Sequence, residues 1–210
     1  MERKPYYETP LGKLYHGDCL EIMPQLEPVD LVLTDMPYNL NFNGITNDNR
    51  ADYEEWAIGI INNFKKETNN IVLFLGINNL HLTYFIKPDW VACWFKPGSM
   101  TVSKCGFNNW QPIYIWGKRR YRGNDVFRAP IVVDKKNEHP TPKPLKLISD
   151  LADLYSAEME TVLDPFLGSG TTAVACERLK RKWIGIEIEE KYCEIAAKRI
   201  EAERKQLKLF

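Results

Sequence analysis

The sequence is poor in the residues that build metal centres and disulfide frameworks. It has three histidines and five cysteines among 210 residues, with no CxxC pair and no cluster of cysteine and histidine. Zinc sites and disulfide-rich domains both require such closely spaced ligands. We therefore expect no metal, and we interpret the cysteines as reduced and mostly buried in the core.

The chain also lacks a long hydrophobic run. None of its apolar segments approaches the roughly 20 residues of a membrane-spanning helix, and the opening MERKPYYETP has no apolar signal-peptide core. Hydrophobic residues make up 44% of the chain and charged residues 27%, which is ordinary for a soluble globular protein. We expect a cytoplasmic protein without membrane contact, folded as a single domain over residues 1–210.

The chain also has no net charge, but its charges are unevenly distributed along the sequence. The formal net charge is zero, which taken alone argues against a nucleic-acid partner. Between residues 96 and 146, however, eleven basic residues stand against three acidic ones. A localised basic region indicates phosphate binding better than the charge of the whole chain does.

Apolar runs and helical patterns alternate along the chain. Strands are predicted at 13–16, 29–34, 70–75, 90–95, 111–116, 161–164 and 183–188, and helices at 52–66, 144–155, 170–180 and 189–206. Several of the strands are continuously apolar, which is typical of strands covered on both faces. The pattern predicts a mostly parallel α/β sheet. The loop at 39–51 is rich in Asn and Gly, which predicts mobility.

The sharpest local signal is TVLDPFLGSGTT at residues 161–172. A strand ends at Asp164, a glycine turn follows, and a helix begins; the pattern GxxxxGK[ST] of a P-loop is absent. The next strand brings Glu187 to its carboxyl end, where an acid can hold ribose hydroxyls. An ordinary strand–helix turn is the alternative, but the downstream acid favours a nucleoside-type ligand.

A second buried strand ends in an unusual group. In LVLTDMPYNL, residues 31–40, an apolar run is followed by Asp35, Met36, Pro37 and Tyr38. The segment admits a structural interpretation, in which Asp35 caps a turn and Tyr38 packs in the core. It also admits a catalytic one, in which a carboxylate, a rigid turn and an aromatic ring act together on a substrate.

Four motifs in order decide between these interpretations. HGDCLEIM at 16–23, Asp-x-Pro-Tyr at 35–38, HPTPKP at 139–144 and DPFLGSGTT with IGIEIEEKY at 164–192 together resemble the DNA amino-methyltransferases of the β class. The resemblance covers nearly the whole chain. It implies a Rossmann-like S-adenosylmethionine-dependent methyltransferase fold with a seven-stranded, mostly parallel sheet and a circularly permuted motif order. It also implies a short basic DNA-recognition insertion at about 97–138.

The resemblance assigns the catalytic group. The Asp35 carboxylate and the Met36 carbonyl would accept hydrogens from the amino group of a base, which makes the nitrogen lone pair available for direct in-line transfer. Tyr38 would stack on the base, which must flip out of the duplex, and Pro37 would fix the turn. Met36 is a departure, because the family usually has proline there.

The resemblance also assigns cofactor and DNA contacts. Asp18 with the backbone at Cys19 would face the adenine of S-adenosyl-L-methionine, although Asp18 could equally be a helix N-cap. The other cofactor residues implied are His139, Thr141, Lys143, Asp164, Phe166, Gly168, Ser169, Gly170, Thr171 and Glu187. The segment KRRYRGNDVFR predicts DNA contacts at Lys118, Arg119, Arg120, Arg122 and Arg128, with a solvated charged loop as the alternative.

The implied function is site-specific methylation of adenine in double-stranded DNA. Adenine is favoured because Asp opens the catalytic motif, whereas cytosine enzymes of the class more often have Ser there. N(4)-cytosine methylation is the closest alternative. The others are a decayed homologue that only binds DNA or cofactor, and methylation of RNA or of a protein amide. A homodimer, a cognate restriction endonuclease and a bacterial, archaeal or phage cytoplasm are further expectations from the resemblance.

Overall fold

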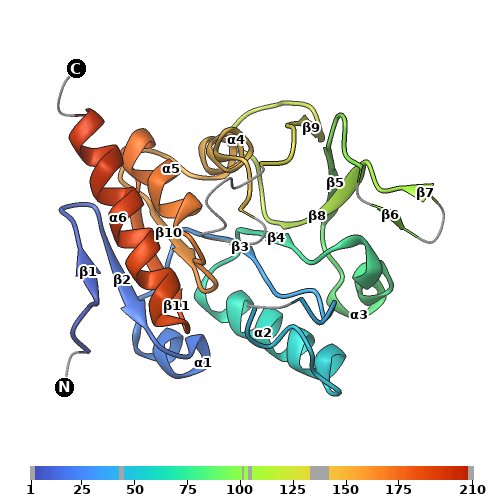
Figure 1. The fold of residues 1–210 in the computed structure, drawn as a ribbon, viewed down its shortest axis with the longest axis horizontal. Helices are drawn as coiled ribbons and strands as arrows, with labels where there is room; N and C mark the ends of the chain where they lie inside the picture. The colour runs from blue at the N-terminus through green and yellow to red at the C-terminus, as the bar shows by residue number, and fades with distance from the viewer. Residues whose placement is uncertain (1–2, 43–44, 101, 104–105, 133–141, 208–210) are drawn as a thin grey trace.

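A twisted central sheet with helices on both faces forms the body of the protein (Figure 1). The computed structural model describes residues 3–42, 45–100, 102–103, 106–132 and 142–207. The strands are β1 (Tyr7–Glu8), β2 (Gly12–His16), β3 (Leu31–Asp35), β4 (Ile71–Phe74), β5 (Trp90–Phe95), β6 (Val102–Ser103), β7 (Gly106–Phe107), β8 (Trp110–Trp116), β9 (Val126–Arg128), β10 (Thr161–Asp164) and β11 (Lys182–Glu187).

The order of strands in the sheet is β1-β2-β11-β10-β3-β4-β8-β5-β9. All seven predicted strands are confirmed, and they occupy the seven consecutive positions from β2 to β5. The prediction of seven strands in total was wrong, since within the described residues nine strands pair in this sheet and β6 pairs with β7 in a separate hairpin. The additional edge strands β1 and β9 are two and three residues long, which is too short to show a period in the sequence.

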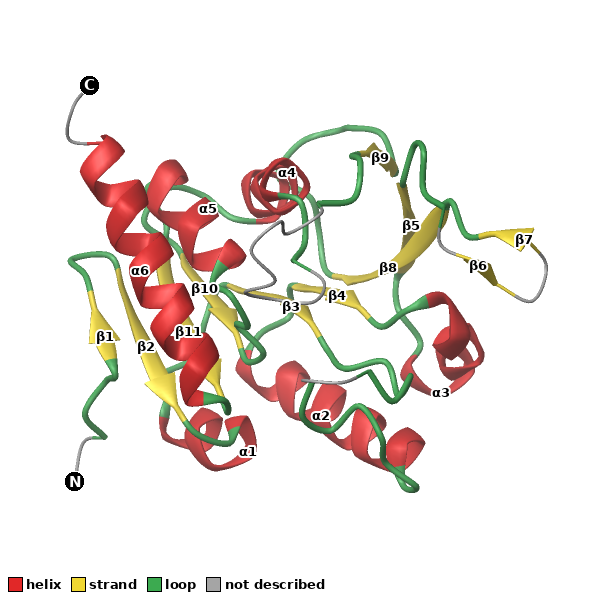
Figure 2. Cartoon of the chain, viewed as in Figure 1, coloured by secondary structure: helices red, strands yellow, loops and turns green. Residues whose placement is uncertain are grey.

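Helices cover both faces of the sheet (Figure 2). They are α1 (Cys19–Ile22), α2 (Tyr53–Glu67), α3 (Thr83–Ile86), α4 (Leu145–Tyr155), α5 (Thr171–Leu179) and α6 (Glu190–Leu207), with 3₁₀ turns at Met23–Gln25 and Ile77–Leu82. The four predicted helices are confirmed as α2, α4, α5 and α6. Helices α4, α5 and α6 share one core with the sheet, and α1, α2 and α3 share the other.

The continuously apolar strands follow from this double covering. In β3, Leu31 and Leu33 pack in the core under α4 and α5, while Val32 between them packs in the core under α2. All three side chains are fully buried. Side chains alternate between the faces of a strand, so a central strand with helices on both faces needs apolar residues at every position.

The connections define where a ligand can bind. From β10 the chain passes through α5 to β11 on one side, and from the adjacent β3 it passes through α2 to β4 on the other. Strands β10 and β3 are parallel neighbours. Ligands in open α/β sheets bind outside the carboxyl ends of strands at such a reversal of order. Asp164 and Asp35 are the last residues of these two strands.

Strand β8 is antiparallel to both of its neighbours, β4 and β5. Its first residues, Trp110 and Gln111, therefore lie at the edge where β3 and β4 end. Its last residue, Trp116, pairs with Ile71 at the start of β4. The segment that follows β8 consequently lies at the opposite edge of the sheet.

Candidate active site

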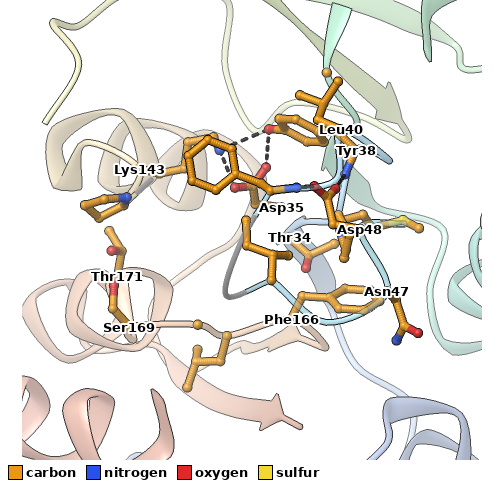
Figure 3. Close-up of a pocket in the computed structure, with 18 of the residues that line it drawn as sticks. Thr34, Asp35, Tyr38, Leu40, Asn47, Asp48, Lys143, Phe166, Ser169 and Thr171 are labelled. Atoms are coloured by element: carbon orange, nitrogen blue, oxygen red, sulfur yellow. Dashed lines mark hydrogen bonds and ion pairs between the residues drawn. The ribbon is translucent and has the colours of Figure 1, made fainter. Parts of the chain in front are cut away.

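A cleft opens at the carboxyl ends of β3 and β10. Its volume is about 1660 Å³, and it is lined by the Asp35–Tyr38 turn, the glycine turn 164–171, Lys143 and Glu187. Figure 3 shows Asp35 and Tyr38 in the same cavity as Phe166, Ser169 and Thr171. The fold thus brings together two motifs that lie some 130 residues apart.

Asp35 and Tyr38 form the polar centre of the cleft. The Tyr38 hydroxyl donates a short hydrogen bond to Asp35 Oδ1 and accepts one from Gln111 Nε2. The Lys143 ammonium forms an ion pair with Asp35 Oδ2 and donates to the Tyr38 hydroxyl at 3.0 Å (Figure 3). Burial and the adjacent carboxylate of Asp35 raise the pKa of Tyr38 well above its ordinary value, so the phenol stays protonated and remains a donor.

Lys143 is enclosed as well as paired. Its side chain is 9% exposed, and its Nζ lies 5.4 Å from the ring centres of Tyr38 and Phe74 and 5.8 Å from that of Trp94. Aromatic faces attract an ammonium group. The structure therefore places Lys143 on the Asp35 carboxylate, and its implied role at the methionine part of a cofactor stays a prediction. His139 and Thr141 lie outside the described residues.

The Asp35–Tyr38 turn is held by its backbone. Met36 is buried, and its N–H donates to the carbonyl of Phe74 at 3.2 Å, which continues the ladder between β3 and β4. The Pro37 carbonyl accepts from the Tyr53 hydroxyl at 2.6 Å, and the Tyr38 carbonyl accepts from Asn79 Nδ2 at 2.9 Å. A proline at position 36 would have no N–H for the first of these bonds.

Asp48 ties the loop that follows to this turn. Its two carboxylate oxygens accept from the backbone N–H groups of Tyr38 and Phe42, each at 2.7 Å. Asn39 Oδ1 accepts from the Arg50 N–H at 2.7 Å. These bonds restrain the described part of a segment whose composition predicts mobility. The Thr46 hydroxyl also donates to Glu189, just beyond β11.

Asp164 is buried beneath the cleft. Its Oδ1 accepts from the Thr34 hydroxyl at 2.6 Å and from the Phe166 N–H at 3.1 Å, so it joins β10 to β3 at the point where the strand order reverses. Burial raises the pKa of this carboxyl to about 6, although hydrogen bonds from Thr172 and Thr34 oppose the rise. This arrangement gives Asp164 a structural role in the described state.

Side chains of β11 and α6 hold the glycine turn at residues 164–171 in place. Glu187 accepts backbone N–H bonds from Gly168 and Glu189, each at 2.8 Å, and burial raises its pKa. Arg199 Nη1 donates to Ser169 Oγ at 2.6 Å and approaches Thr171 Oγ1 at 3.4 Å. Gly170 has a positive φ of +84°, and a Cβ there would lie 2.9 Å from the Cβ of Ala196 on α6.

Asp18 is the N-cap of α1, as one interpretation predicts. Its carboxylate accepts from the Leu20 N–H at 2.8 Å, and it also lines the cleft. Cys19 beside it is buried, which raises the pKa of its thiol to about 12 and keeps it protonated. The acids at the ends of two strands, the ring of Phe166 and the close-approaching glycine turn fit a nucleoside-bearing cofactor.

The predicted DNA contacts are separated by the fold. Arg119 Nε donates to the Tyr155 hydroxyl at 2.9 Å and Nη1 to the Gly123 carbonyl at 2.7 Å. Arg120 donates to the Asp153 carbonyl at 3.0 Å, and the backbone N–H of Lys118 donates to Asn70 at 3.2 Å. These residues follow β8 and pack on the end of α4, at the edge opposite the cleft.

Only one member of that predicted group lies at the cleft edge. Arg128 ends β9 beside Phe95, and its guanidinium lies 5.9 Å from the centre of the Phe95 ring. Lys118, Arg119 and Arg120 thus lie away from the cleft because of the direction of β8. The DNA contacts predicted for them and for Arg122 stay predictions. The expected insertion at 97–138 is also divided, because β8 within it is a central strand.

Sequence reasoning missed three residues of the site, Gln111, Trp94 and Lys96. All three line the cleft. Gln111 of β8 pairs with Trp94 of β5, and Lys96 lies two residues beyond Trp94. The period of two along these strands could have placed Trp94 and Lys96 on one face, but the strand pairing that brings them into the cleft is not visible in the sequence.

Two absences complete the description. Within the described residues, no helix has the length and apolarity needed to cross a bilayer. The same residues contain no group of three or more His, Cys, Asp or Glu side chains arranged to hold a metal ion.

Fold and site define an α/β domain of the Rossmann-like methyltransferase type, and comparison with known proteins agrees. The fold resembles PvuII DNA methyltransferase (cytosine-N4-specific), with a TM-score of 0.79 and 19% identity over 98% of this chain and 95% of that one. It also resembles the M1.HpyAVI–SAM complex, with a TM-score of 0.67 and 24% identity over 90% of this chain and 98% of that one.

Sequence comparison adds the family. Residues 103–198 match the N6_N4_Mtase model of DNA methylases. The chain is 27% identical to type II methyltransferase M.BamHI of Bacillus amyloliquefaciens, over its whole length but only 62% of that relative. It is 28% identical to M2.DpnII of Streptococcus pneumoniae over 95% of the chain and 93% of the relative. The matched residues and these relatives support the resemblance to N6-adenine and N4-cytosine DNA methyltransferases that the four motifs indicate.

Proposed function

We propose that this protein transfers a methyl group from S-adenosyl-L-methionine to the exocyclic amino group of adenine in double-stranded DNA. One observation carries the proposal. The Asp35–Tyr38 turn and the glycine turn end adjacent parallel strands and line one cleft. A methyl donor on the glycine turn and an amino group on Asp35 would therefore meet at the place where strand order reverses.

The chain supplies acceptors for a weakly nucleophilic nitrogen. The lone pair of an exocyclic amino group is delocalised into the base ring. Two acceptors aimed at its hydrogens favour a tetrahedral nitrogen and stabilise the charge that develops on it. Asp35 is one acceptor, held by Tyr38 and Lys143. The Met36 carbonyl is the second, on a backbone fixed by the bond from its own N–H to β4.

The cofactor half of the cleft supports S-adenosyl-L-methionine. Asp18, Phe166 and Glu187 line it together with the glycine turn, and a structural neighbour carries this molecule. When bound, the cofactor supplies an activated methyl group for direct transfer, so that no covalent enzyme intermediate is needed. The same residues would hold the cofactor on the β10 side of Asp35.

Lys143 adds a step before the reaction. Its ammonium occupies Asp35 Oδ2 in the described state, which is where an amino group of the base would bind. Entry of the base therefore requires Lys143 to withdraw from that oxygen or to share it. Tyr38, whose hydroxyl belongs to the same network, serves as the stacking surface for the extruded base.

Incubation with labelled S-adenosyl-L-methionine and unmodified genomic DNA tests the proposal. DNA digested to nucleosides and identified by mass should yield N(6)-methyladenine. N(4)-methylcytosine would assign the chain to the cytosine enzymes of the family instead. Label found only in RNA or protein, or in no acceptor at all, would contradict DNA methylation by this chain.

Asp35→Ala tests the assigned chemistry. We expect turnover to fall below detection while cofactor affinity, measured by calorimetry, stays within about twofold, since Asp35 contacts no residue of the glycine turn in the hydrogen-bond network. Parallel loss of both properties would show that Asp35 holds the cofactor or the fold. Double-stranded DNA is the partner proposed, and the homodimer and the cognate endonuclease stay predictions.

A further inference from the structure

Lys96 is a buried cation in the cleft that the reaction described above does not use. It directly follows β5, is 6% exposed, and lines the cavity. Its Nζ lies 5.7 Å from the centre of the Trp94 ring. Within the described ranges, no carboxylate forms an ion pair with it.

Such a position is unfavourable for a charge. Burial lowers the pKa of Lys96, and the nearby ammonium of Lys143 lowers it further. A buried ammonium without a carboxylate partner destabilises the fold. Lys143 pairs with the Asp35 carboxylate, whereas Lys96 has no carboxylate partner within the described residues. An anionic group of a ligand that entered the cleft beside Lys96 would compensate the charge of this ammonium.

The position of β5 indicates which anion is missing. The cofactor features lie on β10, β11 and the loop after β2, whereas Lys96 extends from β5, three strands from β3 in the other direction. A carboxylate of the cofactor would thus be on the wrong side of Asp35. The substrate side receives nucleic acid, whose only anionic group is the phosphodiester.

One aromatic ring links Lys96 to the Asp35 network. The Nζ atoms of Lys96 and Lys143 lie 5.7 and 5.8 Å from the centre of the same Trp94 ring, so they are no further apart than these two distances combined. Lys143 Nζ is itself bonded to Asp35. Lys96 and, through Lys143, Asp35 are thus both linked to the Trp94 ring, and a nucleotide that entered the cleft beside this ring would approach both.

We propose that Lys96 binds the phosphodiester that flanks the extruded nucleotide, while Asp35 holds the amino group of its base. This inference rests on the proposed function. In this arrangement Lys96 and Asp35 bind opposite ends of the nucleotide, and Trp94 lies between them. Because the phosphate reaches Lys96 only when the nucleotide leaves the duplex, this contact favours the extruded state over the stacked one.

The test compares Lys96→Met with the wild-type chain. Methionine keeps the length of the side chain and removes its charge. Binding is measured at several salt concentrations, on a duplex carrying the site mapped in the methylation experiment. We expect the slope of log K against log salt to fall by about 0.9 and the Kd at low salt to rise about tenfold. Lys118→Met, at the opposite edge of the sheet, is the matched control and should change neither.

A modified duplex makes the test specific to the phosphate. Replacing the phosphodiester next to the target nucleotide by an uncharged methylphosphonate should weaken wild-type binding about tenfold and leave Lys96→Met nearly unaffected. The two changes would then be non-additive, as expected for groups in contact. Moving the methylphosphonate several nucleotides away should weaken both proteins equally.

Each outcome is decisive. Equal losses in wild type and Lys96→Met on the flanking methylphosphonate, with an unchanged salt slope, would overturn the inference while leaving DNA methylation intact. A wild-type chain that neither binds nor methylates DNA would overturn the proposed function, and the inference with it. Unchanged cofactor affinity of Lys96→Met shows that the variant is folded, and Lys96→Arg should retain the wild-type slope.

Discussion

Asp164→Asn should make the protein more stable at neutral pH. Asparagine has the same shape as aspartate, and its carbonyl oxygen can accept the bonds that Thr34 and Phe166 donate to Oδ1. Its amide can donate to the hydroxyl of Thr172. The substitution therefore removes a buried charge and keeps the hydrogen bonds around it.

The magnitude follows from the pKa. A rise from 3.8 to about 6 means that the folded state disfavours the ionised carboxylate by about 3 kcal/mol. Between these two pH values the folded protein binds more protons than the unfolded chain, so its stability falls as the pH rises through the window. The Asp164→Asn variant has no carboxyl group that titrates at this position. Its advantage over wild type should grow by roughly 1 kcal/mol between pH 5 and pH 8.

Urea unfolding at a series of pH values is the assay. The free energy of unfolding is extrapolated for wild type and variant under the same conditions. Asp150→Asn, which changes an exposed carboxylate paired with Lys146, is the control and should show only a small difference. A variant less stable than wild type at pH 8, with a difference that does not grow with pH, would refute the argument that burial penalises this charge.

Three further predictions concern the cleft and its surroundings. Gly76→Ala should lower kcat by up to about a hundredfold with little change in cofactor affinity, because φ at Gly76 is +73° and the new Cβ would lie 2.9 Å from Tyr38 Cγ. Steady-state kinetics measure kcat and calorimetry measures cofactor affinity. Equal losses in kcat and in cofactor affinity would contradict this prediction. Asp48→Ala should cost about 2 kcal/mol of unfolding free energy, because two backbone N–H groups lose their acceptor; Asp48→Asn, which keeps one acceptor, should cost less. Arg119→Ala should lower Tm, because the hydrogen bonds to Tyr155 and Gly123 are lost, and should leave the salt dependence of DNA binding unchanged. A smaller slope of log K against log salt would show that Arg119 contacts DNA, as the sequence alone suggests.

Much of the fold is visible in the sequence for a local reason. The predicted strands and helices are long enough for their period of apolar residues to show. The continuous apolar run Leu31–Leu33 indicates that β3 is buried on both faces. The glycine turn and the Asp35–Tyr38 turn are equally local. Their convergence was predictable only through the resemblance, because adjacency of β3 and β10 depends on the order of strands.

The basic segment at residues 118–122 shows what local patterns leave out. Composition marks residues 118–122 as a DNA contact, but their position depends on whether β8 runs parallel or antiparallel to β4. An apolar run in the sequence does not indicate whether the strand it forms is parallel or antiparallel to its neighbours. Likewise Lys143 lies next to Asp35 because α4 begins above the end of β3, and Gln111 reaches Tyr38 because β8 starts at that edge. Both are consequences of pairing between distant segments.

The bond from the backbone of Met36 to β4 bears on how relatives of this protein are recognised. A search that demands two consecutive prolines in the Asp35–Tyr38 turn would pass over this chain, although the turn has the acid, the second proline and the tyrosine. A residue other than proline at position 36 keeps the backbone carbonyl, and its N–H adds one hydrogen bond to the ladder between β3 and β4. The motif is therefore better described by its main-chain hydrogen bonding than by its side chains, and chains with other residues at this position deserve to be tested for the same chemistry.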